Sequence, residues 1–394
     1  MRDWWRRQFG PNLPLWVAFW VWFAVTAGVI GRVIAVPPER GSVVPIYLVA
    51  GERWLAGSPL YAAIPDLDVY RNPPGIAALF APLSQLGPKP AAILWRLVCL
   101  ALYAFAIHRL VKYVLPPLGG WWRCGVWVSA AVFMIPALNN GQTNLIVTAA
   151  AVLGVVAAAR ARWWEASAWL AACGYFKLYS FAIGLLVVVQ FTRSFGWRFT
   201  VATVALFALP FVLQNPGYVY DSHLQFRDAL TADDRTAADH SRAPRDWTII
   251  PYDVTGVPVA RVVSLGVSLI AAAGFVWVVW KSRQQLPGSV LTPLSLGLIW
   301  ITLFGPSAEV NTYSVLAPVV AAFAFGLPAQ DRLTTWLAWV GSAALLAVEI
   351  RAGVNGRSEF DLSWLQPLGA AMLTWAVIRW VNRGSKTVSG TGGI

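Results

Sequence analysis

Acidic side chains and arginines gather in two long polar stretches, residues 37–90 and 215–256, that interrupt a strongly apolar chain. A carboxylate in such a stretch could act as a general base, and a neighbouring arginine could hold an anion. Adjacent carboxylates could instead bind a divalent cation, or pair with arginines and water. The residues concerned are Glu39, Arg40, Glu52, Asp66, Asp68, Tyr70 and Arg71 in the first stretch, and Asp233, Asp234, Arg235, Arg245 and Asp246 in the second.

A short amide-rich segment, Asn139–Asn144, separates two apolar runs and includes Gln142. Amide side chains offer both donors and an acceptor, which suits the hydroxyl groups of a sugar. The same residue types also cap helices and make turns, so both interpretations stay open.

Two ionisable residues stand within or beside segments apolar enough to reach membrane depth. Lys177 interrupts the run 166–189, and Glu309 lies between two hydrophobic runs. Ionisable groups at membrane depth are costly, which makes them candidates for function. Lys177 would supply a compact positive charge for a phosphate, and the alternative is a lysine that snorkels to the interface.

Motifs for nucleotide, zinc and dinucleotide sites are absent: the chain has no GxxxxGK[ST], no HExxH and no strand-linked GxGxxG. The cysteines Cys99, Cys124 and Cys173 lie in apolar runs without CxxC spacing, which favours small buried residues. His223 and His240 lie in the second polar stretch, but their spacing is not that of a metal site. We therefore expect neither a metal nor a cofactor.

The elements that position these residues must be membrane helices, because 58% of the chain is hydrophobic and only 12% is charged. A soluble domain is about a quarter charged, and about 20 apolar residues span a bilayer as a helix. We predict an all-α, polytopic transmembrane protein of about twelve helices, with two further helices at the interface. The expected spans are 13–36, 91–113, 121–138, 143–159, 165–176, 179–192, 198–214, 257–280, 288–304, 313–327, 333–350 and 364–381, and the interfacial helices are 45–56 and 74–86.

The fifth and sixth spans are too short to cross alone, so we expect a broken pair at Lys177, which is tolerated where it lines a protein cavity. Residues 1–383 would form one transmembrane domain, and 384–394 a disordered tail. With the N-terminus inside, 16 of the 30 lysines and arginines but only three of the 18 acidic residues fall on the cytoplasmic face. Both termini would then be cytoplasmic, and both polar stretches would lie outside.

The chain carries a series of short motifs at Tyr47–Tyr61, Val69–Tyr70, Pro73–Pro74, Leu79–Leu86, Leu94–Arg96, Asn140–Asn144 and Phe176–Tyr179. In their order and spacing these segments resemble glycosyltransferase family 87, bacterial GT-C membrane enzymes that include polyprenol-phosphate-mannose-dependent mannosyltransferases. Two more, Asp233–Arg235 and Gly305–Tyr313, resemble a less-studied bacterial branch of the family. Together they spread over most of residues 14–327.

The resemblance implies a GT-C fold and transfer of a sugar, mannose or another hexose, from polyprenyl phosphate to an acceptor hydroxyl. The reaction would occur on the extracytoplasmic side of a bacterial inner membrane, in the cell envelope, with a glycan or lipid acceptor and no nucleic acid. Lys177 would bind the donor phosphate, and Gln142 and Asn144 would belong to a polar turn facing the cavity. The other residues expected to bind substrate are Tyr47, Tyr70, Tyr313, Arg40, Arg71 and Arg235.

One position departs from the family pattern. Better-known members carry an aspartate, the catalytic base, four residues before the tyrosine that is Tyr47 here, and this chain has Val43. The departure leaves open a member that binds a lipid-linked glycan without catalysis, and a transporter or flippase for such a glycan. If the chain is an enzyme, the base is one of Glu39, Asp66, Asp68, Asp234 and Glu309, of which we favour Asp68 or Asp234.

Overall fold

A computed structural model describes residues 12–232, 244–283, 288–305, 308–327, 331–355, 362 and 364–389, and every regular element in these ranges is a helix. Five helical segments of this described part are long and apolar enough to cross a membrane. They are α2 (Leu13–Ala35), α5 (Pro88–Tyr113), α6 with α7 (Gly120–Phe133 and Ile135–Asn140), α11 with α12 (Thr192–Ala208 and Pro210–Leu213) and α15 (Arg261–Ser282).

The remaining helices complete the bundle. They are α3 (Val44–Ala56), α4 (Pro74–Ser84), α8 (Asn144–Ala159), α9 (Trp163–Phe176), η2 (Leu178–Ser180), α10 (Phe181–Gln190), α13 (Pro216–Ala232), α14 (Ile249–Thr255), η3 (Gly288–Val290), α16 (Leu291–Leu303), η4 (Val310–Leu316), α17 (Ala317–Val320), η5 (Ala321–Gly326), α18 (Arg332–Asn355) and α19 (Leu365–Ser389). The all-helical membrane fold is confirmed, whereas the number of spans stays a prediction.

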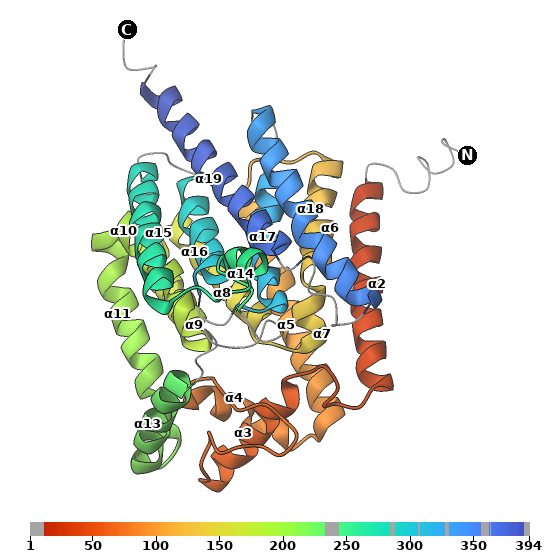
Figure 1. Cartoon of the computed structure of the whole chain (residues 1–394), viewed down its shortest axis with the longest axis vertical. Coiled ribbons are helices and arrows are strands. Elements are labelled where there is room, and N and C mark those ends of the chain that lie inside the picture. The colour runs from red at the N-terminus through yellow and green to blue at the C-terminus, as the bar shows by residue number, and fades with distance from the viewer. Residues whose placement is uncertain are drawn as a thin grey trace.

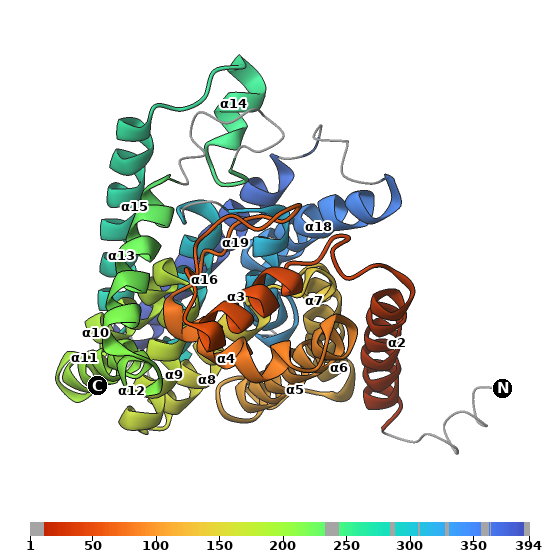
Figure 2. The same ribbon diagram turned by 90° about the horizontal axis from the view of Figure 1, so that it is seen from below.

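The outward faces of α2, α11 and α15 carry large apolar side chains that the rest of the chain leaves uncovered. Trp20 is 56% exposed, Val204 62% and Ile270 75%. A continuous surface of this kind promotes aggregation in water but matches lipid tails in a bilayer. These helices stand at opposite margins of the bundle, α2 on one side and α11 and α15 on the other (Figure 2), so they form part of its lipid-facing rim.

The centre of the bundle is built on α8, which is buried from Asn144 to Ala158. Its side chains are mostly alanine, valine and glycine, and small residues let neighbouring helix backbones approach closely within a membrane. Helices α5 and α9 pack on it from two sides. The start of α8, with Asn144, is therefore held firmly in the interior.

The predicted break at Lys177 is confirmed. Helix α9 ends at Phe176, Lys177 adopts an extended conformation with φ −144° and ψ 111°, and η2 and α10 follow. The Lys177 N–H still donates to the carbonyl of Cys173 at 3.3 Å, and its own carbonyl accepts the N–H of Ser180 at 2.8 Å. The backbone thus changes direction without leaving these polar groups unpaired, as membrane depth requires.

The two ends of the bundle differ in what covers them. Helices α3, α4 and α13 lie together at one end, here called the loop end, and the start of α2 and the last turns of α19 lie at the other, here called the terminal end (Figure 1). Helices α3 and α4 touch closely, because a Cβ added at Gly51 would stand 2.7 Å from the backbone of Phe80. Gln214 and Tyr218 tie the α12–α13 region to this layer through the carbonyls of Trp54 and Ser58.

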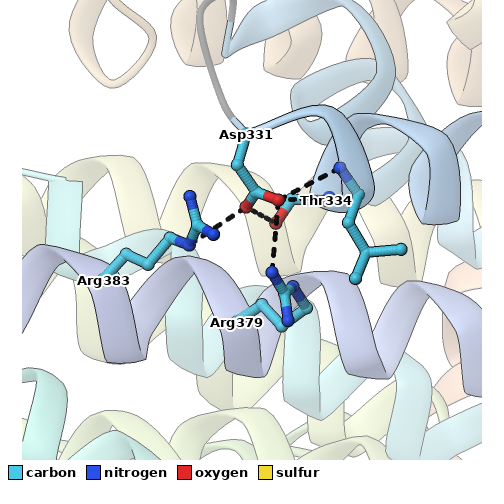
Figure 3. Close-up of polar contacts among 5 residues, drawn as sticks. Asp331, Thr334, Arg379 and Arg383 are labelled. Atoms are coloured by element: carbon cyan, nitrogen blue, oxygen red, sulfur yellow. Dashed lines mark hydrogen bonds and ion pairs between the residues drawn. The ribbon is translucent and has the colours of Figure 1, made fainter.

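At the terminal end, Asp331 joins α18 to α19. Its carboxylate accepts the N–H groups of Leu333 at 3.0 Å and Thr334 at 3.2 Å, which caps α18. Arg379 Nη2 and Arg383 Nε each lie 3.2 Å from one of its oxygens (Figure 3). The hydrogen bonds from Thr334, helped by the two arginines, lower the pKa of Asp331 to about 2.

The observed helices depart from the predicted ones in three places. The stretch 215–256, for which we predicted no helix, contains α13 and α14, and Phe226 of α13 packs against Tyr61 of the first stretch. The span 198–214 starts earlier and is divided at Leu209, just before Pro210, which cannot continue the hydrogen-bonding ladder. Helix α19 continues to Ser389, which lies within the predicted tail 384–394; residues 390–394 lie outside the described part, and the disorder of the tail stays a prediction.

Candidate active site

The last turn of α7 is held by a buried cation from α5. The side chain of Arg96, a residue only 2% exposed, donates from Nε to the carbonyl of Leu138 at 2.9 Å and from Nη2 to that of Asn139 at 2.8 Å. Further bonds reach the carbonyl of Ala92 at 3.0 Å and Oγ of Ser42 at 3.1 Å. The last carbonyls of a helix have no partners within it and carry partial negative charge. The guanidinium therefore both satisfies and neutralises this helix end.

Trp95 and Gly141 fix the turn that follows. Trp95 Nε1 donates to the carbonyl of Gly141 at 2.9 Å, and the N–H of Val43 donates to the carbonyl of Asn140 at 3.0 Å. Gly141 has a φ of +76°, and a Cβ there would stand 2.5 Å from Cγ2 of Val44. Only glycine meets both conditions without strain, so the polar residues after it leave the turn in a set direction.

Polar residues from two distant segments meet just beyond this turn. Gln142 Nε2 donates to Oε2 of half-buried Glu309 at 3.0 Å, and Asn144 Nδ2 donates to Gln142 Oε1 at 2.6 Å and to the carbonyl of Asn311 at 3.0 Å. Glu309 begins η4 with a capping box, in which Thr312 Oγ1 accepts the Glu309 N–H at 3.0 Å and the carboxylate accepts the Thr312 N–H. We call these five residues the amide–carboxylate network.

One acceptor within the network stays open. Asn144 is 0% exposed, yet its Oδ1 has no hydrogen-bond partner among the described residues. The Oδ1 of Asn140, on the turn beside it, is in the same situation. Buried polar atoms are nearly always paired with protein, ligand or water, so this region can accept hydroxyl donors from a bound molecule.

Two buried tyrosines border the network. Tyr47 of α3 lies against Thr143, and burial raises the pKa of Tyr47, with a small further contribution from the charge of Glu309. Tyr313 donates from its hydroxyl to the carbonyl of Arg245 at 2.5 Å. Both tyrosines were expected in the substrate site. Tyr47 lies next to the turn that carries Gln142 and Asn144, and Tyr313 lies on the short segment that begins with Glu309.

The second polar stretch reaches the same place through Arg245 and Asp246, which the sequence singled out as charged residues but to which it assigned no catalytic or binding role. The N–H of Arg245 donates to the carbonyl of Ala308 at 2.7 Å, next to Glu309. Asp246 is only 8% exposed and accepts the N–H of Thr248 at 2.8 Å, and burial raises the pKa of its carboxyl group. In sequence this pair looks like ordinary loop charge, and only the fold buries it.

Lys177 stands at the break in the bundle with its side chain half-buried. Its Nζ lies 5.6 Å from the ring centroid of Tyr179, and it forms no hydrogen bond or ion pair through its ammonium group with the residues that the structure describes. An unpaired cation near membrane depth is costly, so this position suits an anionic ligand. The following η2 packs on α16, which leads towards Glu309, so the break and the network lie on neighbouring elements.

The first polar stretch is joined to the break. Asn72 Nδ2 donates to the carbonyl of Phe176 at 3.1 Å, and the N–H of Gly75 donates to the hydroxyl of Tyr175 at 3.1 Å. Tyr70 is fully buried and donates to the carbonyl of Pro73 at 3.1 Å. Tyr70 therefore packs the stretch into place beside Lys177.

The carboxylate candidates of the first stretch lie on its surface, and Arg71 is half-buried. Asp68 and Arg71 form an ion pair of 2.5 Å, with side chains 58% and 27% exposed. Glu39, Arg40 and Asp66 are exposed as well. The remaining two candidates, Asp234 and Arg235, lie outside the described residues.

Comparison with family models agrees with the resemblance. The model of glycosyltransferase family 87 matches residues 70–306, more than half of the chain. The chain belongs to glycosyltransferase family 87. A search of curated proteins found no match. The matched range contains Lys177, Gln142 and Asn144 but not Tyr47 or Glu309.

Family membership and the apolar helices together make this chain a membrane glycosyltransferase, which takes a sugar from a donor and passes it to an acceptor within a lipid environment. The described residues contain no group of three or more His, Cys, Asp or Glu side chains placed to hold a metal ion. The groups that the described part does offer for the chemistry are the cation at Lys177 and the amide–carboxylate network.

Proposed function

We propose that this family 87 glycosyltransferase uses a polyprenyl-phosphate sugar as its donor, with mannose or another hexose as the sugar. The observation that carries the proposal is the ammonium of Lys177 at the break between α9 and η2, which has no hydrogen-bond or ion-pair partner in the part of the chain that the structure describes. When the sugar leaves, its phosphate passes from one negative charge towards two. A positive charge fixed beside that phosphate stabilises the transition state more than the ground state.

The acceptor hydroxyl would be activated by Glu309. The hydroxyl oxygen of the acceptor attacks the anomeric carbon, and Glu309 receives the hydroxyl proton. The bond from the anomeric carbon to the phosphate oxygen breaks, and its electron pair stays on the phosphate. Attack opposite the leaving group inverts the configuration of the sugar. Support comes from the rigid setting of Glu309, whose position is held both by Gln142 and by the capping box with Thr312.

The reaction would take place at the loop end, facing the outside of a bacterial inner membrane and serving the cell envelope. Both chain termini would be cytoplasmic, and residues 1–383 would act as one domain. The charge distribution supports this orientation, because lysines and arginines concentrate in the short loops expected on the cytoplasmic side. The polyprenyl tail would stay in the lipid beside the helices while its phosphate reaches Lys177.

Replacing Lys177 with alanine tests the donor assignment. Purified protein in proteoliposomes is given polyprenyl-phosphate [¹⁴C]mannose and a panel of glycolipid and polyol acceptors, and labelled product is counted. Loss of one preorganised electrostatic contact lowers the turnover number roughly 10²- to 10³-fold. Lys89→Ala is the matched control, since Lys89 is an exposed lysine at the start of α5 whose ammonium donates to the carbonyl of Ile34. Full activity in Lys177→Ala would refute the assignment.

Glu309→Gln tests the base in the same assay. The amide keeps the size of the side chain but cannot take a proton at neutral pH, so transfer should fall about 10²- to 10⁴-fold while donor binding is retained. Asp68→Asn should lose less than two-fold. The reverse pattern would assign the base to Asp68. Donor binding without turnover on any acceptor in the wild type would instead favour a non-catalytic glycolipid-binding member, which Val43 permits.

A further inference from the structure

Three basic residues surround one aromatic ring, and a fourth lies close by, where α5 ends and α8 turns into α9. Around the Tyr113 ring centroid, Arg160 Cζ lies at 4.2 Å, Arg109 Cζ at 4.9 Å and Lys112 Nζ at 5.2 Å. Arg162 is joined to the same group through Glu165. We call Arg109, Lys112, Arg160 and Arg162 the cation cluster.

The cation cluster is not neutralised by the residues that the structure describes. Glu165 lies 2.6 Å from Arg162 Nη1 and 3.7 Å from Arg109 Nη2, and it is the only acidic residue paired with the cluster in the described ranges. Arg109 also has a buried Nε without a hydrogen-bond partner there. Four cations against one described carboxylate leave the cation cluster and Glu165 with a net charge of +3. Cations held together in this way favour a bound anion.

An apolar wall continues from the cluster along the helix. Phe105 is one turn before Arg109 on α5, its ring centroid lies 5.5 Å from Arg109 Cζ, and it is 47% exposed. Trp164, beside Glu165 at the start of α9, is 52% exposed. Aromatic side chains of this kind mark the membrane interface. A ligand that fits both features has an anionic head and an apolar chain.

We propose that the cation cluster binds the phosphate headgroup of an anionic phospholipid, with an acyl chain lying along the exposed face at Phe105. The cluster lies where α5 ends, at the terminal end of the bundle, whereas α5 begins with Pro88 at the loop end. This lipid is therefore distinct from the sugar donor. Lys112 and Arg160 supply charge to the phosphate, since neither forms an ion pair with a described carboxylate. Arg109 and Arg162 are oriented by Glu165.

Native mass spectrometry of the full chain in detergent measures the site directly. The protein is titrated in turn with phosphatidylglycerol, phosphatidylcholine and inorganic phosphate. Phosphatidylglycerol should bind at least ten-fold more tightly than phosphatidylcholine, and inorganic phosphate should show no specific binding. Each basic residue near an anionic lipid contributes about five-fold in affinity. The double variant Lys112→Gln/Arg160→Gln should therefore bind phosphatidylglycerol about 30-fold more weakly.

Arg283→Gln is the matched control. Arg283 also lies over an aromatic ring, 4.4 Å from the centroid of Trp280, but it is the C-cap residue of α15 and is not part of the cluster. This variant should keep the wild-type preference. The single variant Lys112→Gln, with a loss of about five-fold, covers the case in which the double variant does not fold. Equal affinity for the two lipids, an unchanged preference in both cluster variants, or binding of inorganic phosphate as tight as that of phosphatidylglycerol would overturn the proposal.

Discussion

Replacing Arg96 with lysine keeps a positive charge in the core but removes the planar fork that holds the end of α7. In the wild type the guanidinium makes four hydrogen bonds, to the carbonyls of Ala92, Leu138 and Asn139 and to the hydroxyl of Ser42. An ammonium is a single point on a flexible stem. It can reach at most some of these acceptors at once, so we expect about two of the four bonds to be lost.

The cost follows from those lost bonds. Leaving a buried acceptor without a partner costs about 1–2 kcal/mol, and bonds to charged groups lie at the upper end. Two such acceptors give about 2–4 kcal/mol for Arg96→Lys. At about 2 °C per kcal/mol for a protein larger than 150 residues, the thermal midpoint should fall by roughly 4–8 °C. Transfer activity should fall as well, because the turn that carries Gln142 begins at this helix end.

Both effects are measured on purified protein in one detergent at one scan rate, since membrane proteins often unfold irreversibly. Arg123→Lys is the control: Arg123 is an exposed arginine near the start of α6, and its replacement should shift the midpoint by less than about 1 °C. An Arg96→Lys protein with the wild-type midpoint and wild-type activity would show that the turn is held by something other than the guanidinium.

Two further substitutions probe the same model of the fold. Gly141→Ala should destabilise the protein by about 2–4 kcal/mol and lower its transfer activity, because alanine is strained at a φ of +76° and its Cβ would stand 2.5 Å from Val44. Calorimetry or tryptophan fluorescence measures the thermal midpoint. Gly266→Ala is the control, because a Cβ at Gly266 would meet no atom within 4 Å. Asp331→Asn should lower the midpoint by about 1–2 °C at neutral pH. Since the folded-state pKa of Asp331 lies below its ordinary value of 3.8, at about 2, its contribution is complete above about pH 4 and disappears as the pH falls through 2. A difference between wild type and variant that is as large at pH 2 as at pH 7 would contradict this assignment.

Helix positions could be read from the sequence wherever the signal was local. The run 143–159 predicted α8 to within one residue, because a long apolar segment has no alternative but a buried or membrane helix. Helix α13 was missed for the opposite reason. Its residues are largely polar, and its place depends on contacts with segments more than a hundred residues away, such as that of Tyr218 with Ser58.

The sequence predicted which residues belong to the candidate site but not which of them bond to one another. Gln142, Asn144 and Glu309 were each singled out separately, yet the bond from Gln142 to Glu309 spans 167 positions and no local pattern indicates it. Trp95 and Arg96 appeared only as part of a motif, with no role assigned. Their role depends on backbone carbonyls of another helix. Every residue has a backbone carbonyl, so the sequence does not indicate which of them will accept a hydrogen bond.

The two carboxylates that compete for the role of base differ in how firmly they are held. Asp68 pairs with Arg71 at 2.5 Å, but its side chain is 58% exposed. Glu309 is half-buried and accepts a hydrogen bond from Gln142 at 3.0 Å. A base must stay at a fixed distance from the attacking oxygen, and the capping box with Thr312 gives Glu309 that rigidity. The rigid setting of Glu309 therefore favours it over Asp68 as the base of the proposed reaction.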